Sequence, residues 1–430
     1  MITPPKTHQI LSVGITLVVL LVLFSAILPA RAQASGQSTT DGIPAGLQDY
    51  ERWFGSLHSH THMDGDDGAA GSTAAQAFAY ARNIPFLSYF MVTPHVHQDR
   101  SGADTLWTES TYDSIRLSAA SATTSTFVAI AGQEISTLAS GGHWNLYNSL
   151  DLIGTDHPDG DWNDADDYYD HVAGLGSSGE NIVAQFNHPG TSDFGNLYDA
   201  GATPYFGTIA VSSGPYDSTA VDFSADGSND SYQGVWANRL NMGWKLSPSA
   251  DQDNHEATWG ASSSEYTVIV SPKGTLLTPA NVLKGLRDHM TYATEDPNMQ
   301  IGFLANDGSM GQTIGGNSPV AFTIWWNNPS ETICNNNVPI CRTETAADVI
   351  QSIWIYKNSF SSAVATHNPG TSSGTWIVSV PAAVGDWFVV KFMDTYTLAA
   401  SGRTTDLTWS APVWYDPTTI SLIYLPLVIK

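Results

Sequence analysis

Two histidines at alternate positions, His58 and His60, open a short segment that also carries several aspartates. Side chains two residues apart on a strand point to the same side, so these imidazoles would face one point. The acidic, glycine-rich loop that follows adds Asp64, Asp66 and Asp67. Neutral imidazole and carboxylate together are what a divalent transition metal prefers. On its own, this spacing does not distinguish a metal site from histidines of a core or a surface.

More histidines and acids follow later apolar runs that have the composition of strands. In a β/α barrel, the residues just beyond the carboxyl ends of the strands line the rim where the chemistry occurs. The sequence therefore predicts such a barrel, with a rim of histidine, aspartate and glutamate. The further candidates are His95, His97, Glu134, His143, His188, Asp253 and His255.

The elements that must position these residues follow from hydrophobic spacing. Apolar runs predict strands that end at His58 and at residues 92, 131, 186 and 270. Helical patterns lie between several of them, and two have capping signals: Ser72 or Thr73 would begin one helix, and Thr278 would begin another. The other two helices are expected at 110–122 and 232–242. A glycine-rich stretch at 174–179 is interpreted as a loop.

The pattern changes near Asn298 to short β-branched and aromatic runs separated by turn residues, which is typical of an antiparallel sandwich. We therefore predict an α/β chain, with a barrel domain at 49–296 followed by a β-sandwich domain at 297–416. The apolar tail at 417–430 could be a last strand, or a sorting or membrane-touching segment, and the sequence does not decide between them.

The amino terminus has the features of an export signal. Lys6 precedes an apolar run, and Ala30-Arg31-Ala32 fits a cleavage site. We expect a signal peptide at 1–32, a linker at 33–48 and a secreted or extracytoplasmic protein, with an uncleaved membrane anchor as the rival interpretation. In that setting the chain's two cysteines, Cys334 and Cys341, would form a disulfide that closes a loop.

The charge balance excludes some partners. Among 430 residues, Asp and Glu number 41 and Lys and Arg 16, a formal charge of -25. Such a surface repels nucleic acid and anionic lipid. We expect no nucleic-acid partner and no stable membrane association beyond the signal segment. The oligomeric state is not predicted.

Six short motifs follow one another along the chain: LHSHT (57–61), VTPH (92–95), GQE (132–134), GH (142–143), NHP (187–189) and DNH (253–255). In this order they resemble the polymerase-and-histidinol-phosphatase (PHP) superfamily of metal-dependent hydrolases. The resemblance covers about residues 50–310 and is nearest to a branch of exported metallohydrolases that includes a carbamate-pesticide hydrolase. It implies a distorted seven-stranded β/α barrel and up to three divalent ions.

The resemblance also implies a ligand set. His95, His255 and a loop acid would hold a third ion, with Asp66 the preferred acid and Asp64 the second choice. The family's Thr-Asp-His is Thr-Pro-His here, so Pro94 removes a carboxylate near that third site. The first ion would be held by His58, His60, Glu134 and Asp253, and the second by Glu134, His143 and His188.

Function follows from the ions. We expect a hydrolase, most simply a phosphoesterase, in which a metal-bridging hydroxide cleaves a small-molecule ester and His97 or His255 acts as general acid. Nitrogen-rich ligands favour two to three ions of zinc, manganese or iron. One alternative is a carboxyl-ester or carbamate hydrolase, which the scarcity of basic residues would suit. Another is a non-catalytic extracellular module with a degenerate barrel that binds a glycan or a protein.

Overall fold

The structure is a computed structural model. Several predicted features lie outside the described residues: the signal peptide, Cys334 and Cys341, the loop acids Asp64 and Asp66, His97, and most of the linker and of the apolar tail. Within the described part of the chain, no helix has the length and apolar character needed to cross a bilayer. The described residues are 42–44, 46–62, 68–96, 109–136, 142–153, 165–213, 232–306, 308–330, 348–395 and 405–419.

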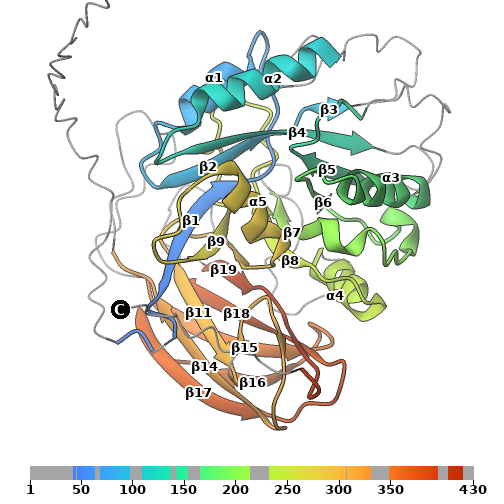
Figure 1. The fold of residues 1–430 in the computed structure, drawn as a ribbon. Coiled ribbons are helices and arrows are strands. Elements are labelled where there is room, and N and C mark those ends of the chain that lie inside the picture. The colour runs from blue at the N-terminus through green and yellow to red at the C-terminus, as the bar shows by residue number, and fades with distance from the viewer. Residues whose placement is uncertain are drawn as a thin grey trace, which may run out of the picture. The chain divides into compact units, whose positions relative to one another are not determined.

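The described residues form a mixed sheet of 16 strands and a separate sheet of four (Figure 1). The first part of the large sheet runs in the order β10-β9-β1-β2-β4-β5-β6-β7-β8. These strands, with the short β3, are β1 Tyr50–Ser56, β2 Leu87–Val92, β3 His95–Val96, β4 Val128–Ser136, β5 His143–Tyr147, β6 Val183–Asn187, β7 Phe206–Ser213, β8 Ser247–Asp251, β9 Tyr266–Pro272 and β10 Thr291–Thr294.

This part of the sheet is curled. Strands β1, β2 and β4 are parallel, as are β6, β7 and β8, whereas β5 runs antiparallel to both of its neighbours. The curl brings β8 back to β9, where the Ala250 N–H donates to Thr267 Oγ1 at 3.1 Å. The predicted barrel is thus present as a curled mixed sheet, while the number of seven strands stays a prediction.

Helices begin where the capping residues predict. Thr73 Oγ1 accepts a hydrogen bond from the Gln76 N–H, and the Thr73 N–H donates to Gln76 Oε1. Thr278 caps α5 by accepting a hydrogen bond from the Asn281 N–H, with proline at the first position of the helix. The glycine-rich stretch predicted as a loop instead belongs largely to α3. The helices are α1 Ala74–Ala81, α2 Glu109–Ala122, α3 Ala165–Ser177, α4 Tyr232–Met242 and α5 Pro279–Arg287, with short 3₁₀ turns η1 Asp193–Asn196 and η2 Thr203–Tyr205.

Helix α5 supports the concave side of the curled sheet. Its buried Val282, Leu283 and Leu286 pack with apolar side chains of β1, β2, β4, β5, β6 and β9. On β4 these are Val128 and Ile130, which by the two-residue period of a strand share a face with position 134. The amino-terminal part of this face is therefore an apolar floor, and polar side chains occupy the opposite end.

The later strands form the separate sheet and extend the large one. Phe322 of the separate sheet packs against Phe388 of the large one, with ring centroids 5.4 Å apart. The separate sheet contains β11 Gln300–Ala305, β12 Gly308–Ser309, β14 Val320–Asn327 and β17 Ser373–Val380. The added strands of the large sheet are β13 Thr313–Ile314, β15 Ile350–Lys357, β16 Ala363–His367, β18 Trp387–Thr395, β19 Thr405–Ser410 and β20 Val413–Tyr415.

The large sheet is continuous across the predicted domain boundary. Strand β10 pairs with β9 on one side and with β19 on the other. The boundary after residue 296 stays a prediction, but the two parts share one set of backbone hydrogen bonds.

Candidate metal centre

The two histidines of the first motif lie just beyond the end of β1. The Thr93 N–H donates to the Ser59 carbonyl and the His60 N–H donates to the Asn254 carbonyl, both at 2.9 Å, so the backbone is held on both sides. His58 and His60 are both buried, and their Nε2 atoms are 3.0 Å apart. The alternate spacing has placed the two imidazoles at one point, as predicted.

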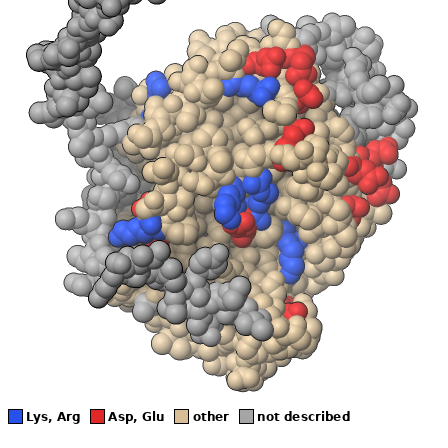
Figure 2. Space-filling model, in the orientation of Figure 1, with Lys and Arg blue, Asp and Glu red and all other residues tan. Residues whose placement is uncertain are grey.

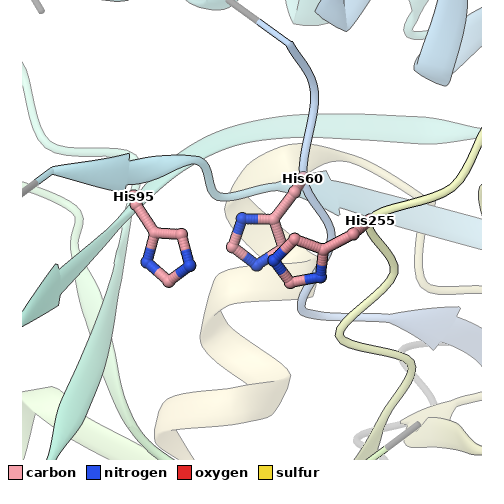
Figure 3. Close-up of side chains that lie close together, drawn as sticks. All are labelled: His60, His95 and His255. Atoms are coloured by element: carbon pink, nitrogen blue, oxygen red, sulfur yellow. The ribbon is translucent and has the colours of Figure 1, made fainter. Parts of the chain in front are cut away.

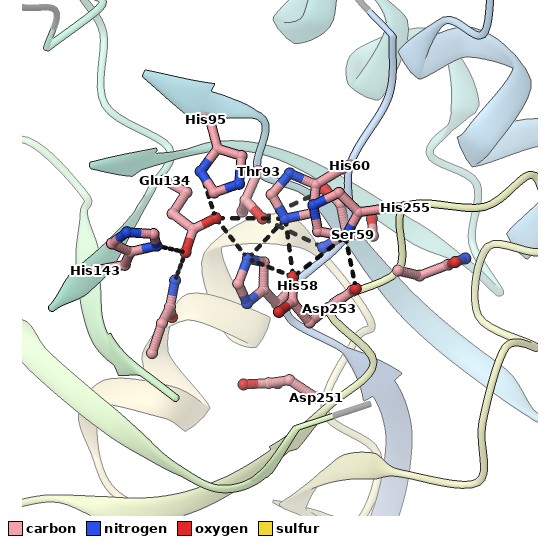
Figure 4. Close-up of polar contacts among 12 residues, drawn as sticks. His58, Ser59, His60, Thr93, His95, Glu134, His143, Asp251, Asp253 and His255 are labelled. Carbon is pink, nitrogen blue, oxygen red and sulfur yellow. Dashed lines mark hydrogen bonds and ion pairs between the residues drawn. The ribbon is translucent and has the colours of Figure 1, made fainter. Parts of the chain in front are cut away.

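His58 and His60 share a compact group with Glu134 and Asp253 (Figure 4). His58 Nε2 lies 2.9 Å from Glu134 Oε2 and 3.5 Å from Asp253 Oδ1. His60 Nε2 lies 3.4 Å and 3.1 Å from the same two oxygens. Four ligands about 2.1 Å from one ion in a tetrahedron are about 3.4 Å apart. The spacing of these four atoms therefore fits a single divalent ion.

The second oxygen of Glu134 faces a different pair of histidines. Oε1 lies 2.9 Å from His143 Nδ1 and 3.1 Å from His188 Nε2. His143 is at the amino end of β5, and it reaches the rim because β5 is antiparallel to its neighbours. One carboxylate thus joins two nitrogen-containing groups.

A third group consists of His60, His95 and His255 (Figure 3). The rings of His60 and His255 are stacked with centroids 3.9 Å apart, and that of His95 is 4.5 Å from His60. His95 Nδ1 is also 3.0 Å from Glu134 Oε2. The loop acids predicted for this group lie outside the described residues, so the group as described is made of imidazoles alone.

Electrostatics hold the two acids in their charged form. Burial alone would raise the pKa of Glu134, but His58, His95, His143 and His188 outweigh it and hold that pKa well below its usual range. Burial likewise opposes ionisation of Asp253, and His58 and His60 outweigh it, so its pKa is also lowered. Both acids therefore offer ionised oxygens to a cation at neutral pH.

A buried chain of polar side chains supports Glu134 from behind. The Asn187 amide donates to Glu134 Oε1 at 3.0 Å, and Gln185 donates to Asn187 Oδ1 at 3.0 Å and to Asp251 Oδ2 at 2.6 Å. Burial raises the pKa of Asp251 to about 6. From the sequence, Asn187 was noted only as part of the NHP motif, and no role was predicted for Gln185 or Asp251, although residues 185 and 187 share a face of β6 because of the strand period.

Among the described residues of the centre, His143 and His188 are the most exposed. The side chain of His143 is 31% exposed and that of His188 24%, whereas those of His58 and Glu134 are at most 1% exposed. A substrate would approach past His143 and His188.

Four basic residues could meet an anionic substrate, and the three that the structure describes are engaged elsewhere. Arg239 donates to the Asp193 carbonyl at 2.7 Å, Arg287 donates to the Ile182 carbonyl at 3.0 Å, and the Lys245 ammonium lies 4.1 Å from the centroid of the Trp414 ring. The fourth, Arg100, lies outside the described residues. Figure 2 shows that charged side chains on one face of the molecule are few and scattered among uncharged ones.

Fold and site together define a chain with a buried cluster of histidine, glutamate and aspartate that fits divalent metal ions. Whether each predicted residue binds metal stays a prediction. No protein-family model matches the chain, and no curated protein matches it.

Solved structures give distant matches. One is a two-domain protein from Bacteroides vulgatus that contains a predicted PHP-like metal-dependent phosphoesterase, with 15% identity and a TM-score of 0.40 over 85% of this chain and 96% of that one. Another is PsfC from Pseudomonas syringae, with 18% identity and a TM-score of 0.33 over 51% of this chain and 82% of that one. A third is a candidate metal-dependent phosphoesterase from Bifidobacterium adolescentis, with 11% identity and a TM-score of 0.27 over 47% and 88%. These similarities are too distant to assign a function.

Proposed function

We propose that the chain is an exported metal-dependent hydrolase of the PHP type that cleaves an ester bond, most simply a phosphoester, with two to three ions of zinc, manganese or iron. The observation that carries the proposal is the position of Glu134. Its Oε2 belongs to the group with His58, and its Oε1 contacts His143 and His188. A carboxylate shared by two nitrogen-containing groups suits two neighbouring ions.

The residues of the chain would hold and orient these ions. Ions bound there would lower the pKa of a water molecule and offset the charge that develops on the ester in the transition state. Asn187 fixes the orientation of Glu134, and the Trp259 Nε1–H donates to the His60 carbonyl at 2.8 Å. Burial of these groups excludes water from the back of the centre.

His255 is suited to proton transfer. With Nδ1–H donating to the Asp253 carbonyl at 3.0 Å, its other nitrogen, Nε2, is the one that exchanges protons. Its side chain is 13% exposed, more than that of His58 and less than those of His143 and His188. We assign the general acid to His255, with His97 as the second choice because it lies outside the described residues.

A carboxyl ester or carbamate is the second candidate substrate. Phosphate groups are commonly bound by arginine, but Arg239 and Arg287 are committed to backbone carbonyls away from the centre. A small or neutral ester needs no such partner.

The test is to purify the full chain without chelator or affinity metal, measure the metals bound per chain, and assay chromogenic phosphomonoester, phosphodiester, carboxyl-ester and carbamate substrates. We expect stoichiometric metal and ester hydrolysis, both largely lost in His58→Ala. His367→Ala is the matched control, because His367 packs against Trp326 and Trp376 in the later strands. Metal-free protein with no turnover after reconstitution would overturn the proposal and favour a binding module.

A further inference from the structure

The turn η1 is bonded to the segment that carries His188. The Gly190 N–H donates to Asp193 Oδ2 at 2.6 Å, and the Asp193 N–H donates to the Gly190 carbonyl at 3.2 Å. Gly190 is two residues beyond His188, and the proline between them restricts the backbone on both of its sides. The position of the turn therefore helps to fix the path of the chain as it leaves β6.

The same turn packs against the segment that carries His143. Gly142 directly precedes His143, and a Cβ at Gly142 would lie 2.7 Å from Phe194 Cε1 and 2.8 Å from Asp193 Cβ. Both distances are shorter than van der Waals contact, so the turn and this segment touch without room for a larger residue. The segments of His143 and His188 thus meet one turn, and their imidazole centroids are 4.9 Å apart.

The backbone of η1 requires contacts from outside the turn. Phe194, Gly195 and Asn196 have φ angles of 61°, 63° and 51°. For a residue with a Cβ this conformation is unfavourable and persists only where the surroundings hold it. The buried Phe194 side chain and a hydrogen bond of 3.2 Å from the Tyr169 hydroxyl to the Phe194 carbonyl supply part of that support.

Arg239 of α4 supplies the charged part of the support. Its side chain is fully buried, and Nη2 donates to the Asp193 carbonyl at 2.7 Å and to Asn196 Oδ1 at 3.3 Å. Its guanidinium carbon lies 5.7 Å from the centroid of the Phe194 ring, within the range of a cation–π contact. One side chain therefore contacts the turn at its first residue, its aromatic ring and its last residue.

We propose that Arg239 is a positioning residue for the second ion, an inference that rests on the proposed function. Through η1 it fixes the relative position of His143 and His188, the two imidazoles that share Glu134 Oε1. The segment of His58 and His60 is held by other backbone hydrogen bonds, to the neighbours of β1. The effect of Arg239 should therefore be confined to the second ion.

The test is stepwise zinc binding to the metal-free full chain, measured by elemental analysis and by competition with chelators. In Arg239→Met we expect the affinity for one ion to fall about 10-fold, the lower end of the range for lost outer contacts of metal ligands, while another ion binds as in the original chain. Arg239→Lys keeps a charged donor and should lose less. Arg287→Met is the matched control, because Arg287 also donates to a backbone carbonyl, that of Ile182, at the opposite end of β6 from His188.

Two further variants test whether the effect passes through the turn. Asp193→Ala removes the hydrogen bond to the Gly190 N–H but keeps the carbonyl that Arg239 binds, so the affinity for the second ion should fall here too. Asp193 is only half-buried, so this variant serves as the test if Arg239→Met does not fold. In a His188→Ala background, which already lacks the second ion, Arg239→Met should not change the remaining zinc affinity further.

The outcomes separate this inference from the proposed function. Unchanged affinity for the second ion in the variants that fold, or an equal loss of every ion, would overturn the role of Arg239 and leave the hydrolase proposal standing. An original chain that binds no metal would overturn both.

Discussion

His188 should carry a proton in the metal-free chain at neutral pH, and metal binding should displace it. Burial alone would lower the pKa of His188, but the hydrogen bond and the charge of Glu134 raise it to about 9. The two groups are in direct contact, with Nε2 and Oε1 3.1 Å apart. An imidazole nitrogen must lose its proton before it binds metal. We therefore predict that metal binding releases this proton and that Glu134→Gln suppresses the release.

The size of the effect on metal affinity follows from the size of the shift in the pKa of His188. With a pKa of about 9, about 97% of His188 is protonated at pH 7.5, and removing the proton costs about 2 kcal/mol. The apparent metal affinity at pH 7.5 is then about 30-fold below its value at high pH, and falls about tenfold further per unit of acidification. In Glu134→Gln the hydrogen bond and the charge of Glu134 are lost, while burial, the charge of Asp253 and a backbone hydrogen bond remain, so the pKa of His188 falls and a smaller fraction of it is protonated.

The assay is calorimetric titration of the metal-free chain with zinc in buffers of different ionisation enthalpy, which gives the number of protons released. At pH 7.5 we expect about one proton more from the original chain than from Glu134→Gln, and a smaller difference towards pH 9. Glu295→Gln is the control, because Glu295 is equally buried but bonds Ser212 and the Leu407 N–H. A His188 pKa below 7 by NMR, or one unchanged in Glu134→Gln, would refute the reasoning.

Three other predictions concern separate parts of the structure. Asn187→Ala should weaken metal binding about 10- to 100-fold, because Glu134 loses its orienting donor; an unchanged affinity in a chelator competition assay would contradict this. Thr73→Ala should lower the free energy of unfolding in urea by about 1 kcal/mol through loss of the capping box, with metal content unchanged. Burial lowers the pKa of His289 to about 4 from 6.5, so its contribution to stability is present above pH 6.5 and is lost as the pH falls towards 4. At pH 5.5 the loss is about 1.4 kcal/mol, and His289→Gln should flatten that part of a urea-stability profile against pH; equal slopes in both chains would count against it.

The grouping of the candidate ligands could be predicted in large part because spacing and strand ends are visible in a sequence. His58 and His60 have the period of a strand, and His188 directly follows β6. Strand direction was not visible. His143 lies at the beginning of a strand, and it reaches the rim only because β5 is antiparallel. Glu134 was expected just after a strand, whereas β4 continues through it to Ser136.

The residues that support Glu134 and the full extent of helix α3 could not be predicted from the sequence, and the reasons are physical. Gln185 and Asn187 are uncharged residues inside a strand, and only the position of Glu134 beside them reveals their role. Helix α3 continues through two glycines at a cost of about 1 kcal/mol each relative to alanine, offset by buried residues such as Tyr169. Gly176 is needed because a Cβ there would lie 2.0 Å from Tyr205 Cε1.

The continuity of the large sheet bears on how the centre is supported. Strand β10 takes backbone hydrogen bonds from β9 and from β19, and Glu295 accepts the Leu407 N–H at 2.9 Å while Ser212 of β7 donates to its other oxygen at 3.3 Å. Removing the later strands would leave β10 with an unpaired edge and Glu295 without its backbone donor. Since β9 and β7 belong to the curled sheet that carries the candidate ligands, the later strands form part of the support of the candidate metal centre.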